Sequence, residues 1–123
     1  MRPPLEAVLA SADERGVTVR WLPLGRWRGC YHQPTRTVYL RAGMSDRLAV
    51  PTLMHELEHA RRGDDGHQSR PVETRIDRLV ACRLITAGEY RRAEVLVGPH
   101  VGALAVELDV PRWVVEAYRD TLR

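Results

Sequence analysis

The part of the chain with the clearest chemical content is His55-Glu56-Leu57-Glu58-His59, an H-E-x-x-H motif. Side chains four residues apart lie one turn apart on the same face of a helix, so both imidazoles can reach one metal ion. Glu56 is offset by one position, and its carboxylate can lie beside an open coordination position and take a proton from water there. The motif therefore predicts a Zn²⁺ site with His55 and His59 as ligands and Glu56 as the catalytic general base.

Glu73 and Asp77, in the segment that follows, supply acidic groups that the motif lacks. With Glu73 as the third protein ligand, the site becomes His₂Glu with one open position, which is the catalytic rather than the structural arrangement of zinc. Asp77 can then accept a hydrogen bond from the non-ligating nitrogen of a metal-bound histidine. The spacing also permits the reverse assignment, with Asp77 as the third ligand and Glu73 behind it.

Two nearby residues, His67 and Glu58, are not expected to be essential to the metal site. His67 lies in the polar loop 63–69 and is a candidate ligand or substrate contact, although a solvated loop histidine is the simpler interpretation. Glu58 points away from both histidines on a helix, so we expect it to be a surface carboxylate.

The periodicity of apolar residues places the motif on a helix. Leu53, Met54, Leu57 and Ala60 form its apolar flank, and the helix runs to about residue 62, with glycine 63 as its stop. Ser45 can cap this helix, and Pro51 suits a first turn better than a helix middle.

The rest of the second half is also predicted to be helical. Ser69 can cap the helix that bears Glu73 and Asp77, and Gly88 is expected to end it. Further helices are expected near 89–96, 101–108 and 111–122.

The first half has a different pattern. Residues 5–15 have helical spacing, Val17 to Trp21 alternate between apolar and polar positions, and 28–32 and 37–40 indicate two more short strands. A small three-stranded sheet followed by helices is an α+β plan. We expect one domain over 1–123, with a helix and sheet in 1–44, the metal-binding helices in 45–88 and a helical C-terminal subregion in 89–123.

Length and composition set further limits. A chain of 123 residues with 44% hydrophobic residues is enough for one domain, and it excludes a large multidomain enzyme and a disordered regulator. The formal net charge is +3, and all 19 basic residues are arginine. Because lysine, asparagine and phenylalanine are all absent, we interpret this as the mark of a GC-rich source rather than of nucleic-acid binding. No apolar run approaches the roughly 20 residues of a membrane span, and we expect a cytoplasmic protein of a bacterial cell with reduced cysteines.

Two stretches resemble a known family. The run from Thr52 to Ala60 resembles the active-site helix of ImmA/IrrE-type metallopeptidases, and the run from Glu73 to Ile85 is similar to that family's second motif. The resemblance covers roughly residues 35 to 90. The chain departs from the family at Ile76, where alanine is usual, and at Glu58, where glycine is frequent.

The resemblance implies a small zincin-like, gluzincin-type endopeptidase of bacteria, phages or mobile elements. The zinc ligands would be His55, His59 and Glu73, and the general base Glu56. The usual substrate in such proteins is a helix-turn-helix repressor, which is cut to relieve repression. An extended substrate commonly pairs with an edge strand above the active-site helix, and the strand at 37–40 is the candidate. The candidates for stabilising the oxyanion are Tyr31, Tyr39, Tyr90, His67 and His100, and spacing favours none of them.

Two other hypotheses remain at this level. Residues 104–115 resemble the core of a helix-turn-helix, which would suit a DNA-binding regulator with an incidental H-E-x-x-H. The second helix offers Arg112, Glu116, Arg119 and Asp120, so acids cancel bases, and we do not expect direct nucleic-acid binding. The other hypothesis is a metal-binding but inactive interaction module.

Overall fold

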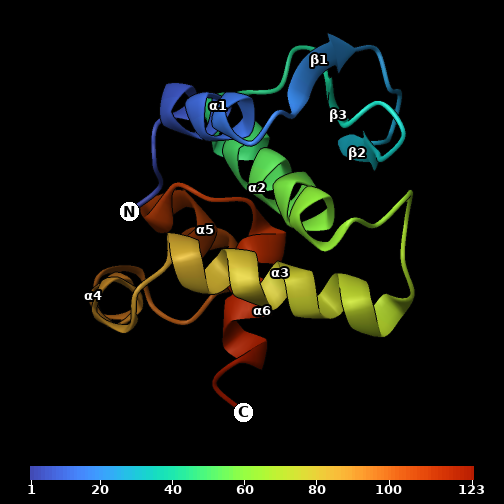
Figure 1. The fold of residues 1–123 in the computed structure, drawn as a ribbon. Coiled ribbons are helices and arrows are strands. Elements are labelled where there is room, and N and C mark those ends of the chain that lie inside the picture. Colours follow the sequence, from blue (N-terminus) through green and yellow to red (C-terminus); the bar gives the residue numbers. More distant parts are fainter.

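Six helices and three strands follow one another in the computed structural model, which describes all residues from 1 to 123. They are α1 (Leu5–Glu14), β1 (Thr18–Leu22), β2 (Gly29–His32), β3 (Thr37–Arg41), α2 (Asp46–Arg62), α3 (Arg70–Leu84), α4 (Ala87–Val97), α5 (Val101–Leu108) and α6 (Arg112–Asp120). Figure 1 shows α2 between two groups of elements, with α1 and the sheet on one side and α3 to α6 on the other. The expected α+β class and the three-stranded sheet are confirmed.

The sheet is mixed and its strand order is β1-β3-β2. β1 pairs with β3 in parallel, and β2 pairs with β3 in antiparallel. The prediction that 37–40 forms an edge strand was therefore wrong, because β3 is the central strand. The physical reason is its burial: Val38 and Leu40 are fully enclosed, whereas β1 is mostly exposed. The free edge next to α2 belongs to β2.

β2 lies against α2 because its first residue is a glycine. A Cβ on Gly29 would lie 2.9 Å from the Thr52 side chain and 2.9 Å from the Tyr39 carbonyl oxygen. Just before it, the Arg28 carbonyl accepts a ladder hydrogen bond from Arg41 N–H, at 2.8 Å. Hydrogen-bonded and non-hydrogen-bonded positions alternate along an antiparallel pair of strands. Gly29 and Tyr31 therefore direct their backbone N–H and C=O groups away from β3, toward the open edge.

α2 begins earlier than the proline suggested. Its N-cap is Ser45, whose side chain makes no capping hydrogen bond, and Pro51 lies inside the helix rather than in its first turn. Proline has no N–H to donate, so one helical hydrogen bond is lost there. Burial offsets that loss, since Pro51 and its neighbours Val50 and Leu53 are fully enclosed in the core. The predicted stop is confirmed: Gly63 has a φ of 76° and ends the helix in the left-handed region.

The boundary after α3 also differs from the prediction. Gly88 was expected to end this helix, but α3 stops at Leu84, and Gly88 lies in the first turn of α4. The reason is a capping box: Thr86 accepts from Glu89 N–H, and the Glu89 carboxylate accepts from Thr86 N–H. The boundary expected between residues 45–88 and 89–123 is thus set by threonine 86, not by the glycine.

The two predicted C-terminal helices are confirmed as α5 and α6. α6 packs on α3 and buries Val114, Val115 and Tyr118, which belong to the same core cluster as the sheet and α2. Asp109, with a φ of 57°, ends α5 and sets the turn between the two helices. No helix of the fold has both the length and the apolar composition that crossing a bilayer requires.

We predict that Gly29→Ala lowers the free energy of unfolding by about 1–3 kcal/mol, because the new methyl group forces β2 and α2 apart. Urea titration followed by circular dichroism measures the change. Gly88→Ala is the control, since its added Cβ meets no atom within 4 Å in a helical turn, and it should be neutral or stabilising. Equal loss of stability in the two variants would contradict the close packing.

Candidate metal centre

Three side chains from two helices meet at one point. His55 and His59 lie one turn apart on α2, and their Nε2 atoms are 2.8 and 3.0 Å from the same Oε1 atom of Glu73, on α3. One potential ligand atom from each residue lies within 4.8 Å of the others. Two imidazole nitrogens and a carboxylate oxygen, with an open cleft beside them, are a donor set that fits zinc.

Glu73 is held in place by its other oxygen. Its Oε2 accepts a hydrogen bond from the Gln68 backbone N–H at 2.8 Å, just before α3 begins. Partial burial alone would raise the pKa of Glu73, but this bond and those with the histidines outweigh it and lower the pKa below the ordinary glutamate value. The carboxylate is therefore charged when it faces the two imidazoles.

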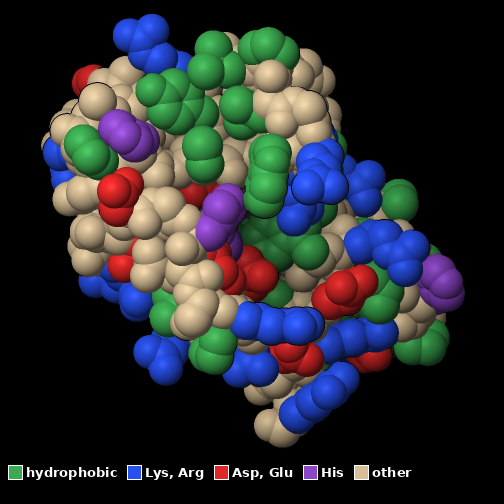
Figure 2. All heavy atoms as spheres, turned by 90° about the vertical axis from the view of Figure 1, so that its right-hand side faces the viewer, with side chains coloured by type: hydrophobic (Ala, Val, Ile, Leu, Met, Phe, Trp, Pro, Cys, Tyr) green, Lys and Arg blue, Asp and Glu red, His purple; other side chains and the backbone are tan.

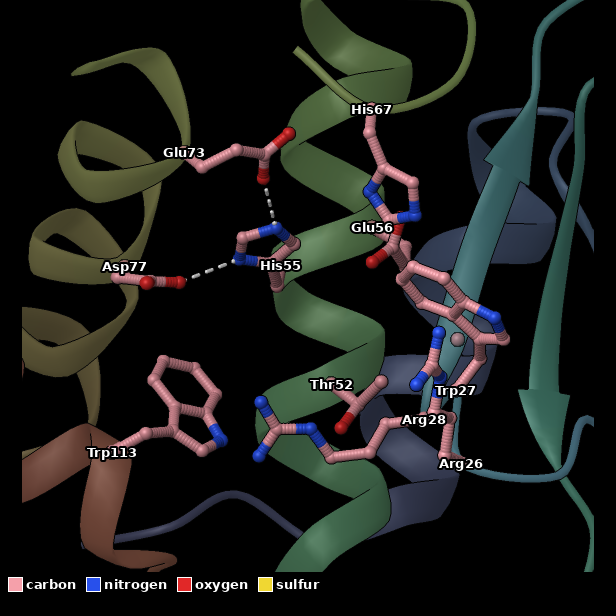
Figure 3. Close-up of a pocket in the computed structure, with 11 residues that line it drawn as sticks. Arg26, Trp27, Arg28, Thr52, His55, Glu56, His67, Glu73, Asp77 and Trp113 are labelled. Carbon is pink, nitrogen blue, oxygen red and sulfur yellow. Dashed lines mark hydrogen bonds and ion pairs between the residues drawn. The ribbon is translucent and has the colours of Figure 1, made fainter. Parts of the chain in front are cut away.

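His55 uses its second nitrogen on Asp77, one turn along α3 from Glu73. The Nδ1 atom lies 2.9 Å from Asp77 Oδ1, so Asp77 is on the opposite side of the ring from the point of convergence (Figure 3). Burial alone would lower the pKa of His55, but the hydrogen bond with Asp77 and the surrounding carboxylates raise it. Of the two assignments that the spacing permitted, the geometry brings Glu73 to the ligand position and Asp77 to the position behind the histidine.

His59 has a matching partner that sequence reasoning missed. Its Nδ1 atom lies 2.9 Å from Asp64 Oδ2, and Arg62 Nε donates to the same oxygen at 2.8 Å. Arg62 and His59 lower the pKa of Asp64 despite its partial desolvation. The signal was the glycine stop: Gly63 turns the chain back so that Asp64 N–H bonds the His59 carbonyl at 3.0 Å, directly beside that ring.

Glu56 lies on the same helix, and its side chain lines the open cleft beside the three converging side chains. The residue is only 6% exposed, and it lines the cleft beside His55 and Glu73. Burial raises the pKa of Glu56, and the nearby histidines oppose that change only in part. A carboxylate that holds a proton more readily than usual is suited to accept and return one.

The prediction for Glu58 was wrong. Its side chain is only 3% exposed, and it accepts a hydrogen bond from Arg61 Nε at 2.8 Å, with Arg83 at 3.8 Å. The face of α2 opposite the histidines is covered by α1 and α3, so a carboxylate there needs paired cations. The other departure from the family motif, Ile76, is also buried, and it packs in the core between α2 and α3.

A cleft of about 430 Å³ opens beside the three metal-ligand candidates. Figure 2 shows histidine and acidic side chains meeting at this hollow, with arginines beside it. The cleft is lined by Arg26, Trp27, Arg28, Gly29, Thr52, His55, Glu56, His67, Glu73, Asp77 and Trp113. The segment that enters β2, the two metal-binding helices and the start of α6 therefore all contribute to its walls.

Of the five residues proposed to stabilise an oxyanion, only His67 lines this cleft. It is exposed, stacks on Trp27 at 5.0 Å between ring centres, and lies outside the three-residue metal group. Tyr31 is buried and bonded to Gln33, the Tyr90 hydroxyl accepts from an arginine, and His100 caps α5. Arg28 and Trp113 line the cleft as well, and neither lies in the two runs that predicted the metal site.

No protein-family model matches this chain, and no curated protein matches it either.

We predict that Asp64→Asn weakens zinc binding about 10- to 100-fold, because the amide no longer orients and polarises His59 as a carboxylate does. Competition against a chromogenic chelator measures the affinity. Asp65→Asn is the matched control, since that carboxylate accepts only from Gln33 N–H at 3.3 Å and touches neither histidine. Equal zinc affinities of the two variants would show that Asp64 does not influence metal binding through His59.

We also predict that Glu56→Gln stabilises the zinc-free protein at neutral pH. The raised pKa means that the folded chain binds this proton more tightly than the unfolded chain does, so the charge costs stability increasingly as pH rises above about 4.5. Chemical denaturation with a chelator present, at a series of pH values, should show the gain shrinking toward that pH. Glu58→Gln should instead destabilise, because it removes the buried charge that pairs with Arg61 and Arg83. A loss of stability in Glu56→Gln would contradict the burial argument.

Proposed function

We propose that the protein is a zinc-dependent endopeptidase. The observation that carries the proposal is the convergence of the two Nε2 atoms and Glu73 Oε1 at the wall of an open cleft, with a buried Glu56 beside them. Three protein donors with one side left open favour a catalytic metal site over a structural one, which would be closed by four. By this proposal the chain has a small zincin-like domain.

The chemistry divides between the metal and the chain. Zinc held by His55, His59 and Glu73 would polarise the scissile carbonyl and lower the pKa of water to near neutral. Glu56 accepts the proton of the attacking water, and its raised pKa lets it carry that proton to the leaving amine. Asp77 and Asp64 fix which nitrogen of each histidine faces the cleft.

An extended substrate would bind along β2. The backbone groups of Gly29 and Tyr31 face away from β3, and Gly29 also lines the cleft, so an added strand would lie above α2. This replaces the interior strand β3 as the docking edge. His67, across from it, is the candidate to stabilise the oxyanion.

The substrate class follows from the resemblance to ImmA/IrrE-type enzymes and is part of the proposal. It implies cleavage of a helix-turn-helix repressor, and purified repressors encoded beside the gene are the first substrates to try.

The DNA-binding hypothesis has less support in the fold. α6, which would be the reading helix, buries Val114 and Val115 against the rest of the core and directs Trp113 into the cleft. α6 thereby contributes a residue to the wall of the candidate site. A metal-binding module without activity would share this geometry, and it is separated from an enzyme by turnover alone.

We predict that Glu56→Gln retains zinc but lowers peptide cleavage by at least about 10²-fold, because the proton acceptor is lost while the ligands remain. Zinc content is measured by elemental analysis. Cleavage is measured by mass spectrometry of new termini in a proteome-derived peptide library.

Glu58→Gln is the control, since it changes a carboxylate on the same helix that faces away from the cleft, and it should keep activity. His59→Ala should lose both zinc and cleavage. Full cleavage by Glu56→Gln would exclude the mechanism, and a zinc-loaded wild type that cuts no library peptide and no neighbouring repressor would favour the inactive module.

A further inference from the structure

One end of the cleft carries an arginine without an acidic partner. Arg28 directly precedes β2, and its guanidinium carbon lies 5.6 Å from the centre of the Trp113 ring. It forms no ion pair with a carboxylate, whereas Arg62, for example, lies 2.8 Å from an oxygen of Asp64. Arg28 is exposed, and stacking on an aromatic face holds its cation at the cleft while its N–H donors stay free to bind a ligand.

Trp113 brings a buried donor without a partner to the same place. Its Nε1 atom is buried and has no hydrogen-bond partner. Figure 3 shows this nitrogen on the side of the ring that faces Arg28. A buried N–H without an acceptor destabilises the folded protein, so an acceptor delivered to this point would recover that free energy.

The acids of the cleft do not fill this role. Glu73 and Asp77 are engaged by the metal-site histidines, and neither carboxylate forms a hydrogen bond with the indole N–H of Trp113. Arg26, also at the cleft, lies over the Trp27 ring and likewise forms no ion pair with a carboxylate. The side of the cleft formed by the segment entering β2 is thus a region of unpaired positive charge.

We propose that Arg28 and the Trp113 indole N–H form a subsite for a carboxylate of the bound peptide. A carboxylate is planar and accepts two parallel hydrogen bonds from a guanidinium, while a remaining lone pair can accept from the indole. The carboxylate is either an aspartate or glutamate side chain or the C-terminus of the peptide. A doubly charged phosphate is disfavoured, because Glu56 and Asp77 line the same cleft.

This subsite deepens the proposed peptidase function, since its place beside the metal group puts the carboxylate next to the bond that would be cut. It makes the enzyme selective for acidic peptides or for chain ends. The binding itself needs no turnover, so it is tested apart from catalysis.

The experiment measures binding of synthetic peptides to the zinc-loaded Glu56→Gln protein by calorimetry and by tryptophan fluorescence. One set consists of acetylated, amidated pentapeptides with a single Asp at each position in turn and matched Asn versions. A second set compares free-acid and amidated C-termini. We expect roughly tenfold tighter binding of the acidic form in one of the two sets.

Three substitutions in the same background test the residues. Arg28→Gln should abolish the preference for the carboxylate, and Trp113→Phe, which keeps a ring and removes the N–H, should reduce it several-fold. Arg20→Gln, an exposed arginine on β1 away from the cleft, should leave it unchanged. Repeating the Asp and Asn comparison on zinc-free protein shows whether the preference persists without the metal.

Each outcome decides the proposal. A preference that Arg28→Gln removes supports the subsite, and the set that shows it identifies a side chain or a chain end as the ligand. Equal binding of acidic and amide peptides, a preference retained in Arg28→Gln, or one that vanishes when zinc is removed would overturn it. These results are independent of whether Glu56→Gln loses cleavage, so failure of the subsite is distinguishable from failure of the peptidase proposal.

Discussion

The arrangement of the candidate site depends on one carboxylate oxygen shared by two imidazoles. Glu73 Oε1 lies within 3.0 Å of Nε2 on both histidines, and each ring is held from behind by an aspartate on Nδ1. Each ring is therefore bound at both nitrogens, which fixes its orientation before any metal arrives. Because Glu73 is on α3 and the histidines are on α2, the contact also joins the two helices at their polar ends, while Ile76 joins them through the core.

The three glutamates of this region have the same side chain and different environments. Glu73 is charged and hydrogen-bonded to backbone and imidazole, whereas Glu58 is buried against arginines. Glu56 is buried beside the cleft with a raised pKa. Their positions decide these differences: Glu56 and Glu58 are two residues, about half a turn, apart on α2, so their side chains lie on opposite faces of the helix. The difference between these three carboxylates follows from burial and partners rather than from residue type.

Local signals in the sequence predicted much of this arrangement, and long-range packing accounts for what they missed. Spacing alone brought His55, His59, Glu73 and Asp77 into one hypothesis, because helical periodicity is a property of neighbouring residues. Periodicity could not predict the order of the strands, since β3 becomes central through burial of Val38 and Leu40 by elements distant in sequence. Glu58 was misplaced for the same reason. Asp64 could have been found from its place after the glycine stop, whereas Trp113 reaches the cleft only through the packing of α6 on α3.

The glycine that ends α2 has an electrostatic consequence as well as a geometric one. The aligned peptide dipoles of a helix leave partial negative charge on the last carbonyl groups, and this effect is confined to the final turn. His59 lies in that final turn, four residues before Gly63. The negative end of the helix therefore lies within one turn of the His59 imidazole, and the backbone adds a negative potential on that side of the site. A longer α2 would carry that negative potential past the site.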